Sequence, residues 1–228
     1  MRPLVIITDI EGTTTPISFV QQVLFPYARA RLPGFCAAHA QDPVMAEVAR
    51  LASGRPPLEA LLGWMDEDAK VTPLKTIQGM IWAEGYRLGE LKGALYADVA
   101  PALRRWHAAG LRLFVYSSGS EEAQKLLFGH SEAGDLTPLF QGFFDTRTGA
   151  KRDPASYRAI CRAAGAAPAE TLFLSDVEAE LDAATMAGLI ACQLVRAADG
   201  TRASQRHPHA ADFEAVARYC GLPSAAPP

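Results

Sequence analysis

Two acidic residues follow a short apolar segment near the N-terminus of the chain. Residues 4–7 are LVII, and Asp9 and Glu11 come directly after Thr8. Residues two apart in a strand point to the same side, so the two carboxylates can converge above the strand's carboxyl end. An isolated acid pair at this spacing is more often a helix cap or a solvated loop. Further groups at the same place are therefore needed to indicate chemistry.

Two later segments could supply the serines and the cation of an anion site. In YSSGSEEAQKLL, Ser117 and Ser118 lie where a predicted strand gives way to a helix. Ser118 and Glu121 match the capping box S-x-x-E, so we expect Ser118 to cap the helix and Ser117 to remain available to an anion at the positive helix end. Lys151, in FFDTRTGAKRDP, lies in a loop before another helix and could balance the charge of a phosphate and of nearby carboxylates.

A second acid pair ends another apolar strand. In FLSDVEAEL, Asp176 follows the strand and Glu180 lies one helical turn later. Parallel strands end at the same edge of a sheet, so Asp9, Ser117 and Asp176 should share that edge. Carboxylate oxygens suit Mg²⁺, which binds oxygen ligands at about 2.1 Å. The sequence therefore predicts a combined magnesium and anion site.

The elements that would position these groups alternate along the chain. Apolar, strand-like segments occupy residues 4–8, 111–117, 171–176 and 189–195. Helix-like segments precede the last three, with Gly110 and Gly188 at two helix ends and Pro154 in one first turn. This alternation predicts an α/β fold, with a Rossmann-like parallel-sheet core and helices on both faces.

Residues 17–95 show helical periodicity without convincing strands, and prolines and Gly54 divide them into about four helices. We therefore predict two domains. Residues 1–16 and 96–228 form an α/β catalytic core, and residues 17–95 form a helical cap inserted after the first strand. Such an insertion overhangs the edge where open α/β sheets bind ligands, as a lid would.

Composition excludes several classes of function. The 228 residues are 49% hydrophobic and 21% charged, and a net charge of −3 offers no basic surface for nucleic acid or an anionic membrane. No apolar segment approaches the roughly 20 residues that span a bilayer. The cysteines are scattered, which favours buried thiols over a zinc site, and we expect His207 and His209 in a surface loop. We expect a soluble, cytoplasmic protein, and we favour a monomer.

The quoted motifs resemble the haloacid dehalogenase superfamily. Its pattern is a nucleophilic Asp in DxDx[TV], a Ser or Thr after the second strand, a Lys and a final acidic pair, which correspond here to Asp9, Ser117, Lys151, Asp176 and Glu180. Glu11 departs from the pattern, because most phosphatases of the superfamily carry Asp there. DIEGTTTPISFV, VYSSGSEEAQKLLFGHS and FFDTRTGAK are similar to the enolase-phosphatases of methionine salvage, and this likeness covers nearly the whole chain.

The resemblance implies a role for each site residue. Asp9 would be the nucleophile and form an aspartyl-phosphate, and Glu11 would act as the general acid and then the general base. One Mg²⁺ per chain would be held by Asp9, Glu11 (through its backbone carbonyl) and Asp176. Four further residues would complete the site: Ser117 and Ser118 would bind phosphoryl oxygens, Lys151 would offset transition-state charge, and Glu180 would orient Lys151 or metal-bound water.

The implied reaction converts 2,3-diketo-5-methylthiopentyl 1-phosphate to 1,2-dihydroxy-3-keto-5-methylthiopentene and phosphate. The base for the enolisation step stays open between Glu11 and a cap residue. The alternative is another capped phosphatase of the superfamily with a different small phosphate ester as substrate. A dehalogenase is disfavoured, because it needs neither Mg²⁺ nor an acid at position 11. A phosphomutase stays an alternative, since it shares the aspartyl-phosphate but passes the phosphoryl group to a sugar hydroxyl. A silent phosphoester-binding module would predict loss of Asp9 or Glu11, and both are present. The motifs GxGxxG and GxxxxGK[ST] are absent, which argues against dinucleotide and P-loop sites.

Overall fold

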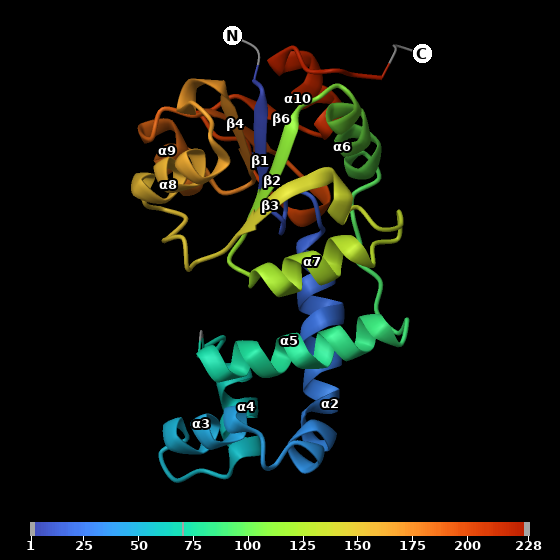
Figure 1. Cartoon of the computed structure of the whole chain (residues 1–228), viewed down its shortest axis with the longest axis vertical. Helices are drawn as coiled ribbons and strands as arrows, with labels where there is room; N and C mark the ends of the chain where they lie inside the picture. The colour runs from blue at the N-terminus through green and yellow to red at the C-terminus, as the bar shows by residue number, and fades with distance from the viewer. Residues whose placement is uncertain (1–2, 70, 226–228) are drawn as a thin grey trace. The chain divides into compact units, whose positions relative to one another are not determined.

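The computed structural model describes residues 3–69 and 71–225 (Figure 1). The chain divides into two compact units. One contains the residues up to Ile17 and those from Gly93 onward, and the other is Ser18–Lys92. The sequence predicted the two boundaries between these units after residue 16 and before residue 96.

The first unit is built on a six-stranded sheet in the order β3-β2-β1-β4-β5-β6, in which every neighbouring pair is parallel. The predicted Rossmann-like α/β core is thus confirmed. Its strands are β1 (Val5–Thr8), β2 (Arg112–Tyr116), β3 (Phe140–Phe144), β4 (Thr171–Ser175), β5 (Ile190–Leu194) and β6 (His209–Ala210).

Helices cover both faces of this sheet (Figure 1). On one face, α8 (Pro154–Ala164) and α9 (Glu178–Met186) bury a cluster that includes Ile7, Tyr116 and Phe173. On the other face, α6 (Val99–Ala108) packs against β2 and against α10 (Phe213–Cys220), and the rings of Trp106 and Phe213 stack 5.2 Å apart. The four central strands, β2, β1, β4 and β5, are near-continuous apolar runs because both of their faces are buried.

Proline and glycine residues mark helix ends in the structure, as the sequence predicted. Pro154 is the first residue of α8, where its missing N–H leaves no unfilled hydrogen bond. Gly110 and Gly188 follow the ends of α6 and α9 with φ of +83° and +92°, a backbone conformation that favours glycine. Helix α7 (Glu121–Gly129) lies against β3.

Two strands were missed by the sequence reasoning. β3 contains Gly142 and lies at one edge of the sheet, so its pattern FQGFF lacks a clear apolar run. β6 is only two residues long and begins at His209, which we had expected in a loop. Strands this short or interrupted carry little periodic signal.

Within its described residues, 18–69 and 71–92, the second unit consists of helices joined by turns and short loops. Its main helices are α2 (Phe25–Ala38), α3 (Pro43–Leu51), α4 (Pro57–Asp66) and α5 (Thr72–Arg87), packed around a core that includes Leu32, Leu61 and Ile77. The short helix α1 (Ile17–Phe19) leads into one π-helical turn, Val20–Leu24, where the Phe25 N–H donates to the Val20 carbonyl. Pro26 follows and has no N–H to continue the α-helical pattern.

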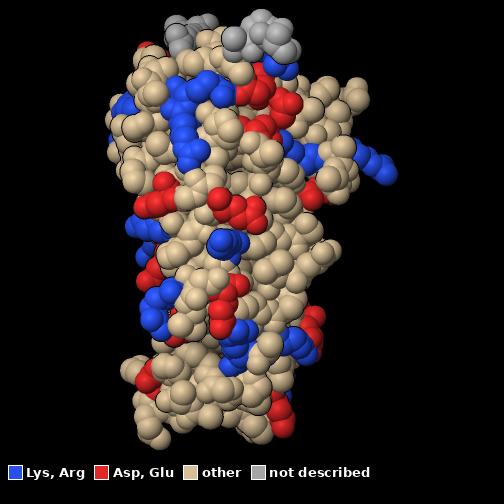
Figure 2. All heavy atoms as spheres, turned by 90° about the vertical axis from the view of Figure 1, so that its right-hand side faces the viewer, with Lys and Arg blue, Asp and Glu red and all other residues tan. Residues whose placement is uncertain are grey.

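The hydropathy of the helices and the distribution of charged side chains both bear on whether the chain could meet a membrane or a charged partner. Among residues 3–69 and 71–225, no helix is both long and apolar enough to cross a bilayer. Acidic and basic side chains are interspersed on the face shown in Figure 2 and do not separate into large regions of one sign.

Candidate active site

The carboxyl ends of three central strands are level with one another. Thr8 of β1 pairs with Val115 of β2 and with Leu174 of β4, so the residues that follow these strands emerge at one edge. The backbone extends this ladder, because Asp9 N–H donates to the Leu174 carbonyl at 2.8 Å. Level strand ends are what place Asp9, Ser117 and Asp176 together.

All the predicted site residues line one pocket of about 220 Å³ within the first unit. Two apolar side chains, Ile17 and Val177, complete its wall. The lining consists of Asp9, Glu11, Ile17, Ser117, Ser118, Lys151, Asp176, Val177 and Glu180. The structure therefore brings together every side chain that the motifs singled out.

A tight turn carries the first acid pair. The Ile10 carbonyl accepts hydrogen bonds from the amides of Thr13, Thr14 and Thr15 at 2.9–3.1 Å. Gly12 lies in this turn with φ +68°, and a Cβ there would be 2.4 Å from Asp176 Oδ2. Glycine is therefore required both by the backbone conformation and by the close approach of the Asp176 carboxylate.

Lys151 lies between two buried carboxylates. Its Nζ is 2.6 Å from Asp9 Oδ1 and 2.7 Å from Glu180 Oε2, and its side chain is only 10% exposed. Burial alone would lower the pKa of Lys151, but attraction to Asp9 and Glu180 outweighs it and raises the pKa. Lys151 is therefore an ammonium ion fixed beside the proposed nucleophile.

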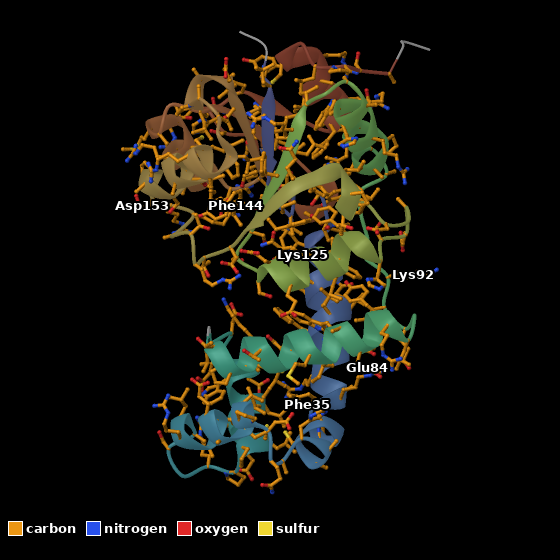
Figure 3. The ribbon with its side chains drawn as sticks, in the orientation of Figure 1. Phe35, Glu84, Lys92, Lys125, Phe144 and Asp153 are labelled. Carbon is orange, nitrogen blue, oxygen red and sulfur yellow. The ribbon has the colours of Figure 1, made fainter. Side chains whose placement is uncertain are left out.

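The loop that carries Lys151 is held by side-chain hydroxyls. Tyr116 donates to the Gly149 carbonyl at 3.0 Å, Ser156 to Ala150 at 2.8 Å and Tyr157 to Lys151 at 2.7 Å. Phe144 at the end of β3 and Asp153 before α8 flank this loop, and both are labelled in Figure 3. These contacts anchor the loop against the sheet face occupied by α8.

Two acids of the pocket, Asp176 and Glu180, have raised pKa values. Burial, followed by repulsion from Asp9, raises the pKa of Asp176 to about 7. The same two causes raise the pKa of Glu180, although Lys151 offsets part of the effect and the Ser175 hydroxyl donates to Glu180 Oε2 at 2.9 Å. Among the described residues that line the pocket, Lys151 is the single basic side chain beside these carboxylates.

One oxygen of this cluster is suited to bind a cation. Asp176 Oδ1 is buried and has no hydrogen-bond partner, an arrangement that a bound metal ion would satisfy. Within the described residues no group of three or more His, Cys, Asp or Glu side chains is arranged to hold a metal. The predicted ligand set requires only two carboxylates, Asp9 and Asp176, with the Glu11 backbone carbonyl. The residues present therefore fit a hard, oxygen-preferring cation such as Mg²⁺.

The cap of α7 differs from the expected one. Ser120, not Ser118, is the N-cap, and its Oγ accepts from Ala123 N–H at 3.2 Å. Glu121 is the first residue of the helix, so it cannot close a capping box with Ser118. Ser118 is consequently an exposed loop residue, while Ser117 is buried and its Oγ accepts from Gly119 N–H at 3.3 Å.

Two buried side chains that hold the serine loop were missed by the sequence reasoning. Gln124 donates to the carbonyls of Gly119 and Phe144 at 2.8 and 2.9 Å. Asp145 accepts from the backbone N–H of Glu121 at 3.3 Å and pairs with Arg147 at 3.0 Å. Asp145 follows β3, so recognition of that strand would have drawn attention to it. A glutamine inside an amphipathic helix gives no comparable signal.

Comparisons with known proteins agree with this geometry. The family model of haloacid dehalogenase-like hydrolases matches residues 4–188. The chain is 61% identical over 226 residues to "Enolase-phosphatase E1" of Granulibacter bethesdensis, covering 97% of this chain and 98% of that protein. It is 59% identical to the protein of the same name in Acidiphilium cryptum, with 99% of each chain covered.

Solved structures share the fold of this chain. The UTR4 protein of Saccharomyces cerevisiae matches with a TM-score of 0.82 and 35% identity, covering 93% of this chain and 99% of that one. CbbY from Rhodobacter sphaeroides, solved with phosphate, shares the fold at a TM-score of 0.62 and 18% identity, over 93% and 95% of the two chains. The chain therefore belongs to the haloacid dehalogenase-like hydrolases and, within them, to the enolase-phosphatase E1 family. It is an enzyme of the hydrolase class, a phosphatase.

Proposed function

We propose that this enzyme is a Mg²⁺-dependent bifunctional enolase-phosphatase of methionine salvage. It would enolise 2,3-diketo-5-methylthiopentyl 1-phosphate and then release phosphate, yielding 1,2-dihydroxy-3-keto-5-methylthiopentene. The observation that carries the proposal is the position of Lys151 Nζ, 2.6 Å from Asp9 and 2.7 Å from Glu180, in a pocket that Ser117 and Asp176 also line. The names of the relatives join the same two activities.

In the phosphatase step Asp9 is the nucleophile. Asp9 Oδ1 accepts from Lys151, and Oδ2 attacks phosphorus as the bond to the leaving enol oxygen breaks. Glu11 gives its proton to that oxygen, and it then takes a proton from the water that hydrolyses the aspartyl-phosphate. Ser117 and Ser118 donate hydrogen bonds to phosphoryl oxygens, and Lys151 offsets the charge that develops on them.

The charge balance of the pocket explains the proposed metal. Among the described residues that line the pocket, Asp9, Asp176 and Glu180 share a single ammonium group, that of Lys151. A phosphate dianion would be repelled by this excess of negative charge. Asp9, Asp176 and the Glu11 carbonyl would hold the ion, and Mg²⁺ would neutralise carboxylate and phosphate charge together. Glu180, fixed by Ser175, would keep the Lys151 ammonium group directed toward Asp9.

We assign two further features on the same basis. We propose that the helical unit Ser18–Lys92 is a cap domain, and that the base for enolisation is either Glu11 or a residue of that unit. We also propose a cytoplasmic monomer, in line with the unremarkable charge and composition of the chain.

The test offers the purified protein the diketone phosphate, or its desthiomethyl analogue, with Mg²⁺, and follows enol absorbance and released phosphate together. Both halves of the proposal predict that enol appears first and phosphate follows, and that chelation of Mg²⁺ stops phosphate release. Asp9→Asn should abolish phosphate release, and accumulation of enol by that variant would show that the two steps use separable groups. Release of phosphate from unrelated esters alone would support a different phosphatase of the same superfamily. No release from any ester would contradict the proposal entirely.

A further inference from the structure

A buried arginine, Arg196, lies two residues after the end of β5. Arg196 is 5% exposed, and its guanidinium donates twice to the Thr13 carbonyl, at 3.2 and 2.8 Å. It also forms a two-pronged ion pair with Asp98 at 2.9 and 3.1 Å, and it donates to the Ala211 carbonyl at 3.2 Å. All five N–H groups of the guanidinium thus donate to an acceptor.

The surroundings fix the guanidinium in this position. Its Cζ lies 4.0 Å from the centroid of the Tyr96 ring and 5.7 Å from that of Phe213. Asp98 is held in turn, because its Oδ2 accepts from Phe213 N–H at 2.8 Å. A buried ion pair of this kind could serve stability alone, since breaking one is strongly destabilising. The identity of its third partner, Thr13, suggests more.

Thr13 connects Arg196 to the pocket. While its carbonyl is held by Arg196, its Oγ1 accepts from Asp176 N–H at 3.0 Å. Thr13 also belongs to the turn that carries Asp9 and Glu11, next to Gly12. Thr13 therefore adds a link between the turn that carries Asp9 and the backbone of Asp176, and Arg196 holds the carbonyl of that threonine.

Neighbouring residues hold the same segment at two further points. Thr14 carbonyl accepts from Tyr96 N–H at 3.0 Å. Asp199 Oδ2 accepts from the backbone N–H of Ile17 at 3.0 Å and from the Tyr96 hydroxyl. Ile17 lines the pocket, so the residues after β5 hold the segment 13–17 from its acidic turn to the apolar wall of the site.

We infer that Arg196 is a positioning residue, which sets the separation of the Asp9 turn and Asp176 through Thr13. The inference rests on the proposed function, because that separation matters chiefly if both carboxylates hold one cation. Arginine is required because its planar fork reaches the Thr13 carbonyl and Asp98 together. A lysine would keep the charge beside Asp98 but could not reproduce that fork.

The test compares Arg196→Lys with Arg112→Lys in the full chain. Arg112 is a matched control because it also donates to two backbone carbonyls, those of Ala164 and Gly165, at the opposite end of β2 from the pocket. Binding of Mg²⁺ alone is measured by calorimetry, and the exchange of backbone amides in residues 12–17 is measured by mass spectrometry. We expect Arg196→Lys to weaken Mg²⁺ binding by about 10-fold and to speed exchange in 12–17. Arg112→Lys should leave both within twofold even where it lowers the melting temperature equally.

A second variant separates positioning from folding. Thr13→Val is nearly isosteric and keeps the carbonyl that Arg196 holds, but it removes the acceptor for Asp176 N–H. It should weaken Mg²⁺ binding to a similar extent, and the double variant should lose little more than the worse single one, because both act along one path. Arg196→Lys with a lowered melting temperature but unchanged Mg²⁺ affinity and exchange would reduce Arg196 to a structural ion pair. Unchanged Mg²⁺ affinity in Thr13→Val would also overturn the inference. Failure of the proposed function would show in the wild-type protein, as no Mg²⁺ binding at all.

Discussion

The contact between Gly12 and Asp176 offers a sharp test of the site geometry. In Gly12→Ala, the new Cβ would lie 2.4 Å from Asp176 Oδ2 and 2.6 Å from its Cγ. An ordinary contact is about 3.5 Å, so the carboxylate or the turn must move by about 1 Å. The variant also places a side chain at φ +68°.

The two effects have different magnitudes and different consequences. A left-handed conformation costs about 1–2 kcal/mol for alanine, and each kcal/mol lowers the melting temperature of a protein this size by about 2–4 °C. That alone predicts a loss of about 2–8 °C. The displacement of Asp176 acts on chemistry instead, where a misplacement of about 1 Å can reduce the rate about 100-fold. Gly12→Ala should therefore fold, with kcat/KM lowered by about two orders of magnitude.

Gly221→Ala is the control for the backbone cost. Gly221 has φ +66°, nearly that of Gly12, and nothing lies within 4 Å of a Cβ built there. Both variants are compared by thermal unfolding and by release of phosphate from the diketone phosphate. We expect similar losses of melting temperature in the two, and a loss of kcat/KM only in Gly12→Ala. Equal activity in the two variants would show that the position of the Asp176 carboxylate does not matter, which would refute the assignment of Asp176 to the site.

Three further predictions follow from the pocket. Lys151→Met should lower kcat by roughly 10³-fold, because it leaves two buried carboxylates facing each other without a cation, and activity within tenfold of wild type would contradict its role. Asp176 has a pKa of about 7 in the metal-free folded protein against an ordinary value of 3.8, so the folded state binds the extra proton between these values. The stability of the metal-free protein should therefore fall as pH rises from about 4 to 7, Mg²⁺ affinity should rise over the same range, and thermal unfolding of wild type and Asp176→Asn with and without Mg²⁺ measures both. Gln124→Met removes the donors that tie the serine loop to the end of β3, so we expect KM for the phosphate ester to rise about tenfold with a smaller change in kcat. Steady-state kinetics would decide it, and an unchanged KM would show that the loop holds its shape without Gln124.

The positions of most strands and of the polar residues that follow them could be predicted from local sequence patterns. Buried parallel strands are continuous apolar runs, so β1, β2, β4 and β5 could be located within a residue or two, and the polar residues that follow them could be placed on one edge by topology alone. The order of the motifs along the chain was sufficient to recognise the family. The strands β3 and β6 could not be predicted, because an edge strand with an internal glycine and a two-residue strand have no periodic signal.

The tertiary structure decided how the site is held together. Arg196 reaches Thr13 across 183 positions of the chain, and Lys151 meets Asp9 only because its loop folds back over the sheet. The pKa of Asp176 likewise depends on burial and on the closeness of Asp9, neither of which is a property of the residue or its neighbours in sequence. Types and order of catalytic groups are local and can be read along the chain. Their distances, partners and protonation depend on contacts between distant segments, which exist only once the sheet has formed.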